Sequence, residues 1–231
     1  MDADTTAMIL TQQRNLTMLK LGSLRPGVPL ELCSQLRVPF ELFSIRTLTL
    51  PEIGSAKELS LYQRMIHKAP RLESLSLQNV SPSVGIGHIL DWDDNQFQDG
   101  IYTRSLFGHR VVQRSLKELR LTSQHLIRAD RTFMRAIRFE TLHRLTLSGC
   151  SGMVPFLHSL AHLFLERGSM LKKLAIDIRK YPVDTATFNH FMQSFRGLED
   201  IHVDVVLPLF HRDYNKEAEN CIVGILKTKP H

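Results

Sequence analysis

The sequence predicts an α/β fold, a single repeat solenoid in which a parallel β-sheet is backed by a row of helices. One short pattern of apolar residues occurs seven times, and its copies are almost evenly spaced along the 231 residues. Segments between the copies have the periodicity of amphipathic helices. Evenly spaced copies of one pattern are typical of stacked structural units, so we expect one domain over residues 1–231.

Each copy of the pattern predicts a short strand. Its spacing is apolar-x-x-apolar-x-apolar. Because side chains alternate along an extended chain, the last two apolar residues point to one side of the sheet and the residue between them points to the other. The seven triplets are Leu16/Leu19/Leu21, Ile45/Leu48/Leu50, Leu72/Leu75/Leu77, Leu116/Leu119/Leu121, Leu142/Leu145/Leu147, Leu171/Leu174/Ile176 and Leu198/Ile201/Val203.

The intervals between triplets predict irregular repeats with one insertion. Successive triplets begin 26 to 29 residues apart, except for one step of 44 residues from Leu72 to Leu116. The longer step predicts an inserted loop at about residues 81–114. Helical periodicity occupies other intervals, for example at Val154, Leu157, Leu160, Ala161, Phe164 and Leu165.

The repeats are expected to stack, because neither the strand nor the helix of one repeat can bury its apolar face alone. Right-handed crossovers would then put the curved sheet on the concave side and the helices on the convex side. The ends of such a stack need protection, and residues 215–227 place their apolar side chains on one helical face. We therefore expect a C-terminal capping helix there.

The repeats resemble the leucine-rich repeat, whose units begin LxxLxLxx and place Asn or Cys at the next position. Cys150 occupies that position in the fifth unit. The other units have Leu24, Ile53, Val80, Gln124, Arg179 and Val206 there. They are similar to the irregular repeats of F-box proteins, particularly fungal ones. This resemblance covers about residues 15–206 and implies the substrate-receptor part of a ubiquitin ligase, whose adaptor would require an F-box upstream.

Composition and charge exclude several classes of protein. The hydrophobic fraction of 43% and the charged fraction of 23% are typical of a folded domain. No apolar run is long enough for a transmembrane helix, and no export signal begins the chain, so we expect a cytoplasmic or nuclear protein. The three cysteines lack CxxC spacing. The net charge of +6 is spread along the chain without a basic block.

A cysteine and two serines lie beside glycines at the end of the fifth predicted strand, a position where some hydrolases have their nucleophile. The α/β-hydrolase turn requires G-x-S-x-G, whereas the residues here are Gly149-Cys150-Ser151-Gly152. The pattern favours a buried Cys150 that packs inside the loop over a reactive thiol.

Two segments contain residues of the kinds that bind metal ions, but neither has a complete set of ligands. His158 and His162 are four residues apart and share a helix face, but the glutamate of HExxH is missing and the sequence shows no third ligand. Asp91, Asp93 and Asn95 fit the start of a calcium-binding loop, whose later glycine and glutamate positions hold other residues. We therefore expect no metal and no cofactor.

Binding residues are expected on two surfaces. The outward strand positions form two rows, Lys20, Thr49, Ser76, Arg120, Thr146, Ala175 and His202, and Met18, Thr47, Ser74, Glu118, Arg144, Lys173 and Asp200. Cross-strand pairing of Glu118 with Arg144 and of Lys173 with Asp200 is the alternative explanation of these charges. The candidates are Arg120, Arg144, Thr146, Lys173 and His202, with Trp92 and Phe97 in the insertion.

The sequence thus predicts a non-catalytic protein–protein interaction module. A free-standing scaffold or a nucleic-acid-associated protein is the alternative, although no basic stripe is interleaved with aromatic residues. An enzyme that uses Cys150 or the histidines is less favoured, because no catalytic constellation is complete.

Overall fold

The computed structural model describes residues 13, 15–22, 42–52, 62, 65–66, 68–78, 115–123, 126, 137–180 and 183–205. The strands in this part are β1 (Met18–Lys20), β2 (Thr47–Leu50), β3 (Ser74–Gln78), β4 (Glu118–Thr122), β5 (Arg144–Ser148), β6 (Lys173–Asp177) and β7 (Asp200–Asp204). The helices whose bounds the structure describes are α6 (Met153–Arg167), α7 (Thr185–Gln193) and the 3-10 helix η3 (Phe139–Thr141).

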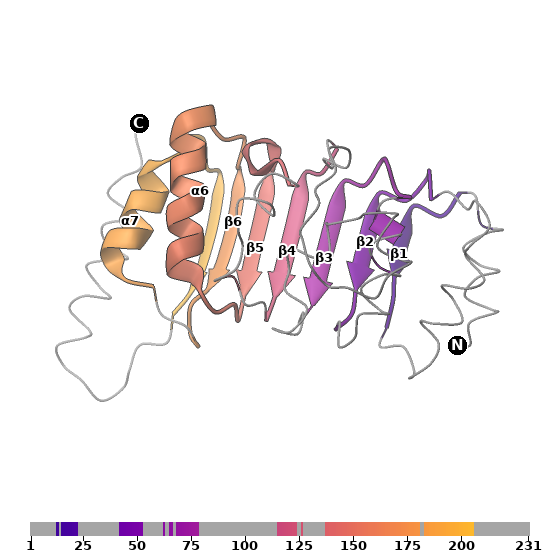
Figure 1. The fold of residues 1–231 in the computed structure, drawn as a ribbon, viewed down its shortest axis with the longest axis horizontal. Helices are drawn as coiled ribbons and strands as arrows, with labels where there is room; N and C mark the ends of the chain where they lie inside the picture. The colour runs from indigo at the N-terminus through magenta and orange to yellow at the C-terminus, as the bar shows by residue number, and fades with distance from the viewer. Residues whose placement is uncertain are drawn as a thin grey trace, which may run out of the picture.

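The strands form one parallel sheet in chain order, β1 to β7 (Figure 1). Corresponding residues of the apolar triplets stand opposite one another. Leu145, for example, pairs with Leu119 of β4 and with Leu174 of β6. The predicted α/β class and the predicted parallel sheet are therefore confirmed.

The inward side of the sheet is a ladder of buried aliphatic side chains. In β5 the exposure alternates, with Leu145 and Leu147 completely buried and the residues beside them accessible to solvent. The first residue of the triplet, Leu142, is buried as well and begins the same core. The alternation that predicted the strands thus also predicted which side faces the core. In β7, Ile201 and Val203 are only half-buried.

Helices α6 and α7 lie side by side against one face of the sheet, at its β5–β7 end (Figure 1). Helix α6 begins after Gly152, whose φ of 71° suits glycine, and ends at Gly168 with a φ of 78°. Its buried residues are Met153, Phe156, Leu157, Leu160, Ala161 and Phe164. The apolar face predicted for this helix was partly wrong, because Val154 and Leu165 are exposed.

Helix α7 begins at a side-chain cap. The Asp184 carboxylate accepts hydrogen bonds from the backbone N–H and the hydroxyl of Thr187, at 2.8 and 2.7 Å. These bonds hold the pKa of Asp184 below its usual value. Phe191 then packs between Phe164 of α6 and Phe195, with ring centroids 6.1 and 5.1 Å away, so aromatic contacts join the two helices.

Two predicted segments, the insertion at 81–114 with Trp92 and Phe97 and the capping helix at 215–227, lie outside the described residues. Within the described part, no helix has the length and apolar character needed to span a bilayer.

Candidate functional site

The outward face of β4–β7 brings together the five candidate residues that the structure describes. The register places Arg120 opposite Thr146, and His202 opposite Ala175, in one row across the sheet. Arg144 and Lys173 are paired neighbours in the adjoining row. These side chains project from rigid strands on the side of the sheet away from the core, so they form one polar surface.

The two cross-strand ion pairs expected on this surface are present. Arg144 Nη1 lies 3.2 Å from Glu118 Oε1, and Lys173 Nζ lies 3.8 Å from Asp200 Oδ2. All four side chains are substantially exposed, and pairs of this kind contribute less than about 1 kcal/mol each. The charges of Arg144 and Lys173 thus have partners within the sheet itself.

A further row of ion pairs, not predicted from the sequence, lies just before the strands. Glu73 accepts from Arg46 at 2.6 Å and from Lys117 at 3.3 Å, and Lys172 donates to Glu199 at 2.7 Å. The hydrogen bonds from lysine hold the pKa values of Glu73 and Glu199 below their usual range. The sequence spacing could have predicted this row, because each of these charged residues directly follows the first residue of a triplet.

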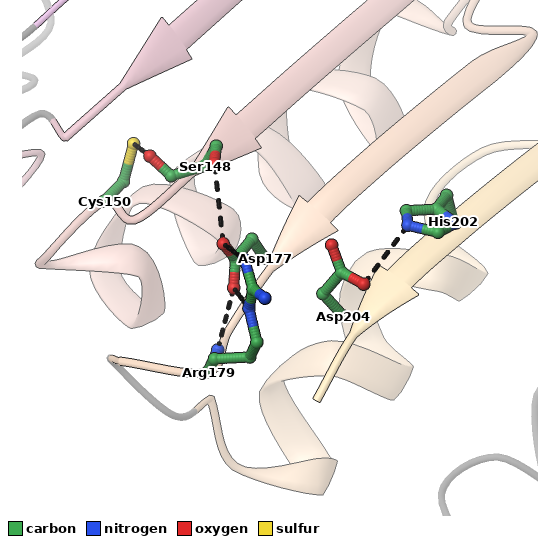
Figure 2. Close-up of polar contacts among 6 residues, drawn as sticks. All are labelled: Ser148, Cys150, Asp177, Arg179, His202 and Asp204. Carbon is green, nitrogen blue, oxygen red and sulfur yellow. Dashed lines mark hydrogen bonds and ion pairs between the residues drawn. The ribbon is translucent and has the colours of Figure 1, made fainter. Parts of the chain in front are cut away.

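The carboxyl ends of β5–β7 carry a third polar cluster, also not predicted (Figure 2). Asp177 accepts two hydrogen bonds from the Arg179 guanidinium, at 2.8 and 2.7 Å, and a longer one from the Ser148 hydroxyl at 3.4 Å. In β7, His202 Nε2 lies 3.2 Å from Asp204 Oδ1. Extending the strand alternation one residue past each triplet would have placed Ser148, Asp177 and Asp204 on the outward face.

The Arg179 guanidinium lowers the pKa of Asp177 to about 2, chiefly through its hydrogen bonds. The Asp177 side chain is only 12% exposed, whereas the Arg179 side chain is 55% exposed, so water screens the pair from the arginine side. Two parallel bonds of this kind also fix orientation. The pair therefore holds the loop after β6 against the end of the strand.

Asp177→Asn should lower the free energy of unfolding at neutral pH and have a smaller effect in acid. The folded pKa of about 2 lies below the ordinary 3.8, so the carboxylate stabilises the fold above about pH 4 and this contribution is lost as the pH falls toward 2. We expect the variant to lose about 1 kcal/mol at pH 7, since the guanidinium is largely exposed. Urea unfolding of both proteins should show this difference shrinking to about half near pH 3; a difference independent of pH would contradict it.

Cys150 is the buried residue of the turn between β5 and α6. Its side chain is completely buried, and its Sγ lies 3.5 Å from the Leu121 carbonyl oxygen. The carbonyl oxygen of Ser148 is 3.6 Å from the same Sγ (Figure 2). Gly149, with a φ of 61°, makes the preceding turn. These contacts support the predicted structural role, in which the thiol closes the loop behind the strand.

Cys150 should resist alkylation in the folded protein, because a buried thiol presents little thiolate to the reagent. Peptide mapping after iodoacetamide treatment should find Cys150 unmodified under native conditions and modified in denaturant. Rapid native labelling would contradict the structural role. Cys150→Ala should also destabilise the fold by about 1 kcal/mol.

Arg120 differs from the other cations of this surface. It is exposed in the middle of the sheet, between Ser76 of β3 and Thr146 of β5. Within the described residues, no acidic side chain forms an ion pair with it, whereas Arg144 and Lys173 are both paired. Among the residues that the structure describes, the centre of the outward face therefore offers a guanidinium without an ion-pair partner, with the hydroxyl side chains of Ser76 and Thr146 on either side.

Comparisons with protein-family models and with curated protein sequences find no match for this chain.

Proposed function

We propose that this chain is an irregular leucine-rich-repeat protein that binds a partner protein through the outward face of β4–β7, without catalysis. Seven parallel strands in chain order, with the apolar triplets in register, support the repeat architecture. In such a solenoid the sheet lines the concave side, which is the usual binding surface of repeat proteins. The available guanidinium of Arg120 is the observation on which the binding surface depends.

The partner we propose is a protein segment with an exposed carboxylate. Arginine binds carboxylates through two parallel hydrogen bonds and is enriched among the residues that dominate binding energy. The hydroxyls of Ser76 and Thr146 beside Arg120 can donate to or accept from the partner's backbone. Nucleic acid is less favoured, because the ion pairs of Arg144 with Glu118 and of Lys173 with Asp200 partly neutralise the basic residues of this face.

The resemblance to F-box proteins makes the proposal more specific. In that version the chain recognises the substrate of a ubiquitin ligase, and a ligase adaptor is recovered together with the partner. A free-standing scaffold would give the same dependence on Arg120 without the adaptor.

Quantitative affinity capture tests the proposal. The full chain, Arg120→Glu and the matched charge reversal Arg196→Glu, which alters an exposed arginine between α7 and β7, would each be used as bait in native extract. We expect Arg120→Glu to reduce recovery of the partner at least about tenfold. The substitution would put a carboxylate against the partner's carboxylate, and such a charge reversal costs more than about 1.4 kcal/mol of binding free energy. Arg196→Glu should recover it normally.

Equal loss with both variants, or no loss with Arg120→Glu, would contradict the proposed surface. Retention on a polyanion column that depends on salt and on Arg120 would instead favour the nucleic-acid alternative.

A further inference from the structure

Helices α6 and α7 bring three imidazoles together where the two helices meet. His158 and His162 lie one turn apart on α6, with ring centroids 4.8 Å from each other. His190 of α7 completes the group, its ring centroid 5.5 Å from that of His158 and 6.1 Å from that of His162. The three residues, which we call the histidine cluster, can each offer one ring nitrogen so that all three nitrogens lie within 4.8 Å of one another.

His190 lies where a third ligand would have to be, a position that the sequence did not reveal. Two histidines four residues apart on a helix are a recurrent half of a metal site, but a catalytic or structural zinc ion needs three or four protein ligands. His190 lies on another helix, so no spacing rule connects it with His158 and His162. The packing of α7 against α6 brings it to them.

The cluster includes a buried ring nitrogen that the described part of the chain leaves unsatisfied. His190 Nε2 is buried, and it has no hydrogen bond to any part of the chain that the structure describes. Buried polar atoms are nearly always satisfied, and an ion is one of the recognised explanations for an exception. A metal ion bound at this nitrogen would satisfy it.

The chemistry of the three ligands favours zinc. Imidazole nitrogen is a preferred ligand of Zn²⁺ at about 2.0–2.1 Å, and a tetrahedral site with three histidines keeps its fourth position for water. That geometry places the nitrogens about 3.4 Å apart, so the cluster must contract by up to about 1.4 Å. His158 and His162 are exposed at the helix surface, and rotation of their side chains can provide this movement.

We propose that His158, His162 and His190 form a Zn²⁺ site that clamps α7 to α6. The site lies on the helical side of the sheet, away from the outward face of β4–β7, and is independent of partner binding there. The ion would add a link between two helices that the aromatic contacts of Phe191 already join. Because the ion binds the folded arrangement, it should raise the unfolding temperature.

Zinc titration of the tag-free, metal-depleted full chain tests this proposal. Calorimetry should give one equivalent of bound Zn²⁺, and Co²⁺ in its place should show the visible absorption of a tetrahedral site. His162→Ala and His190→Ala should each weaken binding at least about 100-fold, since even loss of residues that only orient a ligand costs about 10- to 100-fold. His202→Ala is the matched control, because it removes an exposed imidazole from β7 and should leave binding unchanged.

If His190→Ala does not fold, variants of the two exposed histidines on α6 still test the proposal. His158→Ala and His162→Ala change exposed positions of α6, so they should fold normally and still lose binding and the zinc-dependent rise in unfolding temperature. Unchanged zinc affinity in these two variants, equal weakening by His202→Ala, or no binding at millimolar Zn²⁺ would each overturn the proposal.

Discussion

Leu147→Ala should lower the free energy of unfolding by about 3 kcal/mol, among the largest effects expected for a single substitution in this protein. Leu147 is completely buried in β5 and stands between Leu121 of β4 and Ile176 of β6 in the register of the sheet. Truncating it removes apolar contacts and leaves a cavity that rigid neighbouring strands cannot close. Urea unfolding measured by circular dichroism would give the value.

The adjacent residue provides the control. Thr146 points to the outward side of the same strand, so Thr146→Ala should cost no more than about 1 kcal/mol, from the lower strand propensity of alanine. Similar losses at the two positions would contradict the assignment of core side and outward side in β5.

Phe191→Ala should cost a similar amount, about 3–4 kcal/mol, and should loosen the contact between α6 and α7. Its ring is completely buried and contacts both Phe164 and Phe195, so truncation removes the centre of the aromatic group between the helices. Urea unfolding would measure the loss. Hydrogen exchange of the α7 amides should accelerate more than that of the β4 amides.

Phe191→Leu is the graded control, because it retains most of the apolar volume and should lose less than half as much stability. Asn189→Ala, two residues before Phe191 and not among the buried residues of the same helix, should have little effect. A loss below about 1 kcal/mol for Phe191→Ala would show that this aromatic contact does not hold the helices together.

The strands and their pairing were predictable because both depend on local alternation. Leu119, Leu145 and Leu174 each belong to the same triplet position, and identical spacing in neighbouring units places like residues opposite one another. Once this register is assumed, the pairing of Glu118 with Arg144 and of Lys173 with Asp200 follows. For this reason the outward face could be located before its geometry was known.

Other features depend on packing that no local pattern encodes. Arg179 turns back onto Asp177 from the loop after β6, where strand alternation has ended. His190 meets His158 and His162 only because two helices pack together. Val154 and Leu165 showed the limit of helical periodicity, since apolar residues at the edge of a helix face can remain exposed. The roles predicted for Trp92 and Phe97 stay predictions.

A partner that binds as proposed covers the outward face of β4–β7, and protection of introduced cysteines from labelling would detect this. Thr146→Cys would report on that face, and Ser159→Cys would report on the exposed surface of α6. With the captured partner bound, maleimide labelling at position 146 should slow at least about tenfold while labelling at position 159 stays unchanged. Protection at position 159 with free labelling at position 146 would contradict the account.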